Sequence, residues 1–109
     1  MAKFTRTLTG DFDQILKKVV SAVMDGSVSA TLEDAWDARE GSSRCAVRVF
    51  ERYSWVGGNR VSLSLTLFQA APDQPIHLSA ITSGGSQAIF TKINTLGESA
   101  FLDTLTQLL

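Results

Sequence analysis

The sequence predicts an α+β fold, with a single antiparallel sheet of about five strands and an N-terminal and a C-terminal helix packed on one face. Residues 45–55 and 60–67 alternate apolar and polar side chains, which is the period of a β-strand with one buried face. Residues 11–25 and 96–109 carry apolar side chains at helical spacing instead. The strands between these helices follow one another without an intervening helix, which favours antiparallel pairing. All 109 residues are expected to form one domain.

The first two elements are a short strand and a helix. Thr, a good strand former, alternates with larger side chains over residues 3–9, and Gly10 ends this strand. Asp11 is placed to cap a helix over 11–25, and Gln14, three residues on, completes a capping box. The apolar stripe of this helix needs a sheet to lie on.

The second strand is expected over residues 27–38, where the alternation resumes. Leu32 and Trp36 fall on the same apolar side of it. The adjacent acids Glu33 and Asp34 break the alternation, which indicates either a β-bulge or the end of the strand.

A long hairpin over residues 44–70 is the centre of the sheet, and a turn over 40–43 leads into it. An odd, three-residue loop over 57–59 keeps the aliphatic residues of both strands on one face, because residues opposite each other share a face. That face is expected to point toward the helices. The expected pairs are Trp55 with Val61, Tyr53 with Leu63, Glu51 with Leu65, and Val49 with Leu67.

The remaining elements complete the sheet and the second helix. A turn over 71–75 holds both prolines of the chain, and a strand follows over 76–82. Residues 87–93 are expected to form a short strand or an extended piece. A capping box over 95–98 starts the C-terminal helix, which runs from Leu96 to the last residue.

The register places several side chains on the face away from the helices. Arg48, Phe50, Arg52 and, diagonally, Phe68 would form a patch of two Phe and two Arg, which suits a partner surface. A second copy of the chain is the simplest partner. Scattered surface aromatics without such a role are the alternative.

The same register places Glu51 on the apolar face. Either Glu51 lies near the sheet rim or pairs with an Arg or Lys, or it is a pocket carboxylate with a raised pKa. In the second case Trp36, Glu51, Tyr53 and Trp55 would line a small-ligand cavity between the sheet and the C-terminal helix, as in reduced helix-grip folds.

Other motifs carry weaker signals. Successive N–H groups of the loop Ser83-Gly84-Gly85-Ser86 can cradle an anion, but the Lys-Ser/Thr ending of a phosphate-binding loop is missing, and a structural turn is the alternative. His77, the one histidine, is expected to face solvent. The acidic residues have no His at metal-ligand spacing, so neither a metal nor another cofactor is expected.

Composition narrows the class of protein. The net charge of −1 gives no basic field for nucleic acid. No apolar run is long enough to span a membrane, and the first residues lack the apolar core of a signal peptide. Cys45 is the only cysteine, which excludes an internal disulfide and fits a reducing compartment, so the cytoplasm is the expected location.

Five short runs resemble those of one small, uncharacterised bacterial family, a domain of unknown function found in Gram-positive anaerobes. They are SATLED (29–34), VFERYS (49–54), GNRVSL (58–63), SAITSGGS (79–86) and NTLGE (94–98). The resemblance implies no activity, substrate or catalytic residue.

Three functions remain open from the sequence. The first is a non-catalytic binding or self-assembling domain, and the second is the small-ligand module described above. The third is an enzyme with a pocket carboxylate, which is the least favoured, because no triad order, metal spacing or cofactor fingerprint connects its candidate groups. These groups are Glu51, Arg52, Arg60, His77, Ser86 and Glu98.

Overall fold

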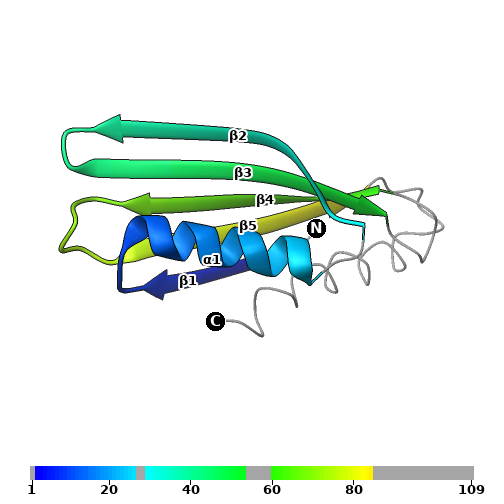
Figure 1. Cartoon of the computed structure of the whole chain (residues 1–109), viewed down its shortest axis with the longest axis horizontal. Coiled ribbons are helices and arrows are strands. Elements are labelled where there is room, and N and C mark those ends of the chain that lie inside the picture. Colours follow the sequence, from blue (N-terminus) through cyan, green and yellow to red (C-terminus); the bar gives the residue numbers. More distant parts are fainter. Residues whose placement is uncertain (1, 27–28, 54–59, 85–109) are drawn as a thin grey trace.

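The computed structural model describes residues 2–26, 29–53 and 60–84 and shows a five-stranded antiparallel sheet with a helix on one face (Figure 1). The strand order is β1-β5-β4-β3-β2, so β2 to β5 form a meander and β1 pairs with β5. This confirms the antiparallel sheet, whereas the short strand over 87–93 and the C-terminal helix lie outside the described residues. The elements are β1 (Ala2–Leu8), α1 (Phe12–Asp25), β2 (Thr31–Glu40), β3 (Ser43–Tyr53), β4 (Arg60–Gln69) and β5 (Ile76–Gly84).

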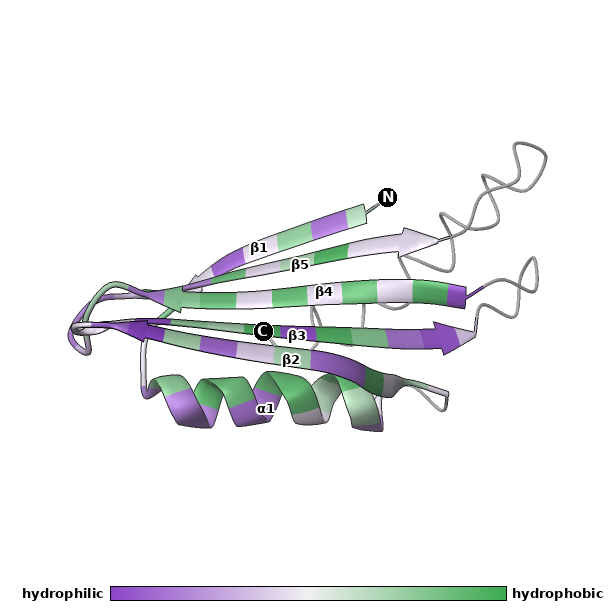
Figure 2. Cartoon of the chain, turned by 90° about the horizontal axis from the view of Figure 1, so that it is seen from above, coloured by the Kyte–Doolittle hydropathy of each residue, from purple (hydrophilic) through white to green (hydrophobic). Residues whose placement is uncertain are grey.

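Helix α1 begins where the capping residue predicts. The Gln14 backbone N–H donates to Asp11 Oδ2 at 3.0 Å, which satisfies one of the N–H groups that a helix leaves without an internal partner in its first turn. Phe12, Val19 and Val23 are buried, and Figure 2 shows the apolar side of α1 turned toward the sheet. The predicted apolar stripe is therefore confirmed.

Strand β2 contains the predicted interruption, and it is a bulge. The pairing with β3 shifts between Leu32 and Asp34, so Glu33 is an extra residue, and the strand continues to Glu40. A tight turn follows, with Gly41 at φ 57°, and returns the chain into β3.

The predicted register of the central hairpin is wrong by three residues, and an odd shift exchanges the two faces. Tyr53 pairs with Arg60 and Phe50 with Leu63, so the loop between β3 and β4 contains an even number of residues. The three-residue loop was inferred on the assumption that arginine is kept off the core face. Arginine tolerates that face because its long stem packs against apolar neighbours while its charged end reaches outward.

The two faces of the sheet differ in what covers them. We call the face against α1 the inner face and the opposite one the outer face. Most of the core lies between α1 and the inner sides of β3, β4 and β5. The core residues are Phe12, Val19, Val23, Ala46, Phe50, Val61, Leu63, Leu65, Leu67, Ile76, Leu78 and Ala80.

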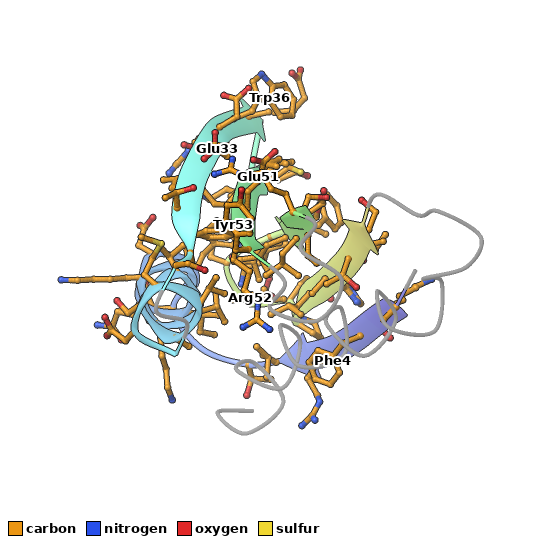
Figure 3. All side chains as sticks on the ribbon, turned by 90° about the vertical axis from the view of Figure 1, so that its right-hand side faces the viewer. Phe4, Glu33, Trp36, Glu51, Arg52 and Tyr53 are labelled. Carbon is orange, nitrogen blue, oxygen red and sulfur yellow. The ribbon has the colours of Figure 1, made fainter. Side chains whose placement is uncertain are left out.

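The observed register separates the patch that the sequence predicted. Phe50 is fully buried on the inner face, whereas Phe68 is on the outer face and 42% exposed. Arg48 and Arg52 share the inner face with Phe50, and Figure 3 shows Arg52 on the side of α1. The prediction that these four residues form one surface is therefore wrong.

The predicted cavity lies between the sheet and the C-terminal helix, which is outside the described residues, and the described members of its lining are on the face away from α1. Glu51 and Tyr53 lie on the outer face, and Trp36 points away from α1 (Figure 3). Trp55 lies outside the described residues. The three described side chains therefore cannot face a cavity on the α1 side.

Candidate functional site

The outer face has no helix on it among the described residues, and strand register orders its side chains into rows. One row runs from β1 to β2 through Thr5, Ser79, Thr66, Val47 and Trp36. The next row runs through Thr7, His77, Phe68, Cys45 and Ala38. The face therefore has a hydroxyl-rich half on β1, β5 and β4 and an apolar half on β3 and β2.

The apolar half is a continuous group of side chains, which we call the outer apolar strip: Trp36, Ala38, Cys45, Val47 and Val49. Trp36 is 61% exposed and lies opposite Val47. The other four are half-buried. The strip thus leaves apolar surface in contact with water, which is costly unless something covers it.

The bulge in β2 determines where Trp36 points. Leu32, before the bulge, pairs with Phe50 on the inner face, whereas Trp36 pairs with Val47 on the outer face. The prediction that Leu32 and Trp36 share a side is wrong, because a bulge residue shifts the alternation of all later residues by one. The sequence contained the necessary signal in Glu33 and Asp34.

The hydroxyl-rich half contains a hollow of about 560 Å³. His77 is exposed there, as predicted, and its ring is stacked on Phe68 with centroids 6.4 Å apart and an interplanar angle of 24°. The lining residues are Thr5, Arg6, Thr7, Thr66, Phe68, His77, Leu78 and Ser79. Sequence reasoning missed this group because its members come from three strands whose register the hydrophobic pattern left open.

Glu51 lies at the far end of the outer face and is paired. Arg60 Nη1 is 2.8 Å from Glu51 Oε1, and the Arg60 guanidinium is 5.6 Å from the centre of the Tyr53 ring. Close by, the Thr31 hydroxyl donates to the carboxylate of Glu33. Of the two predicted alternatives for Glu51, pairing with an arginine is confirmed.

The candidate acid and the candidate base are far apart. Glu51 is in the same row as Ser62 and Ser83, three rows from the row of His77. With a rise of about 3.3 Å per residue, the separation along the strands is roughly 20 Å. A proton cannot pass directly between groups at that distance.

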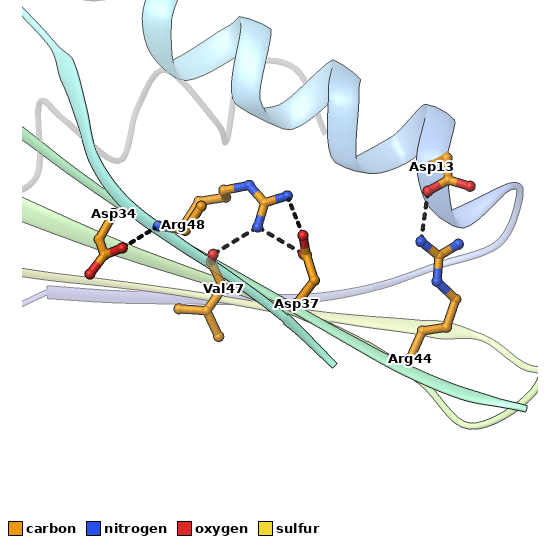
Figure 4. Close-up of polar contacts among 7 residues, drawn as sticks. Asp13, Asp34, Asp37, Arg44, Val47 and Arg48 are labelled. Carbon is orange, nitrogen blue, oxygen red and sulfur yellow. Dashed lines mark hydrogen bonds and ion pairs between the residues drawn. The ribbon is translucent and has the colours of Figure 1, made fainter. Parts of the chain in front are cut away.

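Two further ion pairs lie on the α1 side of the sheet (Figure 4). Arg48 binds Asp37 with both terminal nitrogens, at 2.9 and 3.2 Å, and its side chain is only 15% exposed. Arg44 reaches Asp13 in the first turn of α1. On the same face, burial lowers the pKa of Arg52. The two ion pairs attach α1 and the edge strand β2 to β3.

The predicted anion loop is partly strand. Ser83 and Gly84 belong to β5 and pair with Ser62 and Val61, and the Ser62 and Ser83 hydroxyls are 2.7 Å apart. The turn over 83–86 was therefore placed too early. Gly85 and Ser86 lie outside the described residues.

The described part of the chain has neither a metal-binding cluster nor a membrane-spanning helix. Over 2–26, 29–53 and 60–84, no group of three or more His, Cys, Asp or Glu side chains is arranged to hold a metal ion. In the same part of the chain, no helix has the length and apolar character needed to span a membrane.

Comparison with known proteins places the chain in a family. A model described as a family of unknown function (DUF6054) matches residues 1–109, which confirms the resemblance to a domain of unknown function. No curated protein matches the chain.

Proposed function

The chain belongs to this family of unknown function, and we propose from its geometry that it is a non-catalytic, self-associating domain. In this proposal two copies pack their outer apolar strips against each other. The observation that carries it is Trp36, a large apolar side chain left 61% exposed beside Val47. Tryptophan is among the side chains that contribute most to protein interfaces.

The edge of the sheet explains why a second copy would stack on the face and not extend the sheet. β2 is an edge strand, and its described side chains include Glu33, Asp34, Asp37 and Glu40. Acidic side chains and the bulge at Glu33 both hinder pairing with another strand. The face beside that edge has no comparable protection at Trp36 and Val47, which lie opposite each other.

The available area supports a weak dimer. Two strands about 4.8 Å apart and about ten residues long cover a footprint of roughly 10 × 33 Å. Two such footprints bury on the order of 700 Å², the size of a weak, transient contact. We expect a dissociation constant on the order of 100 μM.

Sedimentation analysis over about 5 to 500 μM, a range that brackets the expected constant, tests the proposal. The wild type should change from monomer to dimer, Trp36→Lys should remain a monomer, and Met24→Lys should dimerise like the wild type. Met24 is the matched control because it is 37% exposed on α1, away from the strip. A wild type that stays monomeric throughout, or a folded Trp36→Lys that dimerises equally well, would refute the proposal.

We also propose that residues 96–109 form the second helix on the inner face. A helix of 14 residues such as α1 is about 21 Å long, so it is too short to cover the whole length of strands of ten residues, which span about 33 Å. Val61 and Thr82 are nevertheless fully buried. The apolar stripe of Phe101, Leu102 and Leu105 supports a second cover, and Leu105→Asp should then lower the melting temperature.

A reducing, cytoplasmic setting fits the single cysteine, Cys45.

A further inference from the structure

We propose that the hollow over β1, β5 and β4 binds a neutral, polyhydroxylated ring, of the kind that a single hexose unit presents. This goes beyond self-association, because the hollow and the outer apolar strip occupy different halves of the outer face. The proposal rests on the chemistry of the lining side chains, the arrangement that register gives them, and the volume of the hollow.

Register fixes the arrangement as a grid of two rows and three strands. Adjacent strands are about 4.8 Å apart, and side chains two residues apart on one strand are about 6.6 Å apart. The hollow of about 560 Å³ is within the usual range for small-ligand sites. The first row is Thr5, Ser79 and Thr66, and the second is Thr7, His77 and Phe68.

The hydroxyl groups suit a ligand that is itself a polyol. Each Ser or Thr hydroxyl both donates and accepts, and so does each hydroxyl of a sugar, so four such side chains can pair with ring substituents in several ways. The His77 ring adds two further nitrogens that can take part in hydrogen bonds. A ligand with only acceptors or only donors would use half of this capacity.

Phe68 supplies the apolar part of the site. Its side chain is 42% exposed beside the hydroxyl groups. The C–H face of a pyranose ring is apolar, whereas its edge carries hydroxyl groups. A sugar lying on Phe68 would therefore cover apolar surface while its edge bonds to Thr66 and Ser79.

Charge argues against other ligand classes. Among the described residues, the lining includes no Asp or Glu, so these residues offer no carboxylate to a metal ion or an organic cation. The permanent cation among the lining residues is Arg6, whose guanidinium lies 5.1 Å from the centre of the Phe4 ring on the inner face. An uncharged ligand fits these surroundings best.

The test uses His77, which as the only histidine gives an unambiguous imidazole NMR signal. Glucose, galactose and mannose are titrated to about 100 mM, with glycerol as an open-chain polyol and methyl glucoside to represent the end unit of a glycan. For a hexose of about twelve non-hydrogen atoms in an open site, we expect a dissociation constant on the order of 1 mM for at least one sugar. Equal binding of the methyl glycoside would identify a glycan end as the source, and its exclusion would identify the free sugar.

Variants locate the binding. Thr66→Val and Phe68→Ala should each weaken binding about tenfold, whereas Ser64→Ala, one row away on the same strand, and Trp36→Lys, in the strip, should leave it unchanged. Loss of self-association in Trp36→Lys with binding intact would separate this site from the proposed dimer. No saturable His77 shift with any sugar, or a shift that persists in folded Thr66→Val and Phe68→Ala, would overturn the proposal.

Discussion

Arg44 on β3 binds Asp13 in the first turn of α1, with Nη2 2.7 Å from Oδ1. The same guanidinium lies over the ring of Phe12, with Cζ 4.2 Å from its centre. One side chain thus holds the start of α1 by charge and by contact with an aromatic face. It connects the helix to β3, a strand whose buried face the hydrophobic pattern alone does not identify.

The first prediction concerns the pH dependence of this contact. The hydrogen bond from Arg44 lowers the pKa of Asp13 below its ordinary value of 3.8. A carboxyl with a lowered folded pKa contributes stability above its unfolded pKa, and the contribution disappears as the pH falls through the folded pKa. We expect Asp13→Asn to lower the free energy of unfolding slightly at about pH 7 and to have no effect near about pH 2. Urea unfolding at several pH values measures this.

A matched acid provides the control for that series. Asp73 is exposed in the turn between β4 and β5, and Asp73→Asn serves as the reference for the removal of a surface carboxylate. The effect at Asp13 should also disappear when Arg44 is replaced by Met, which keeps a long side chain over Phe12. An unchanged effect of Asp13→Asn in the Arg44→Met background would contradict the assignment to this pair.

Elements whose signals are local could be predicted from the sequence. The start of α1 depends on Asp11 and Gln14, and its buried stripe depends on helical spacing, so no distant contact is needed to infer either. The bulge at Glu33 is equally local, because two adjacent acids interrupt an alternating strand.

The register of β3 could not be predicted in the same way. Both faces of this strand carry apolar residues, with Ala46 and Phe50 on one and Val47 and Val49 on the other. The predicted register keeps the charge of Arg52, and with it that of Arg48 on the same face, away from the core, and that reasoning ignores an acid available on β2. Asp37 neutralises Arg48 on the inner face, and a cross-strand partner of this kind becomes visible only once the strands are paired.

The residues that make up the candidate site depend on the register of the strands. Trp36 joins the outer apolar strip only after the bulge is counted, and Phe68 meets His77 only through the pairing of β4 with β5. Pairing with an arginine, one of the alternatives for Glu51, is confirmed, but on the outer face and not on the predicted apolar face. A register error of three residues, which exchanges the two faces of a strand, therefore alters the site more than it alters the fold.

The second prediction tests the register directly. Phe50 is fully buried opposite Leu63, whereas its neighbour Val49 is half-buried on the outer face. We expect Phe50→Ala to cost about 3–5 kcal/mol and Val49→Ala only about 1 kcal/mol. Chemical denaturation measures both. A larger loss from Val49→Ala than from Phe50→Ala would restore the register that the hydrophobic pattern suggested.

The third prediction concerns Arg48 and Asp37. Asp37→Asn leaves the largely buried guanidinium without its counter-charge, and because Asp37 is 65% exposed we expect a cost of only about 1 kcal/mol. Arg48→Met keeps the packed stem and removes the charge, so it should cost less. A double-mutant cycle measures the coupling, and the two variants should not be additive. Additive effects would show that the two side chains do not stabilise the sheet as a pair.

The last prediction concerns Gly41 in the turn between β2 and β3. Its φ of 57° is in the left-handed region, and a Cβ added there would meet nothing within 4 Å, so any cost of substitution comes from the backbone and not from a clash. We expect Gly41→Val to cost about 1–2 kcal/mol, since branched side chains avoid this region, and Gly41→Asn distinctly less, since Asn adopts it more readily. Thermal unfolding measures both, with Ser42→Val as the control one residue later. Equal losses from Asn and Val at position 41 would mean that another property of this turn, and not its left-handed backbone, requires glycine.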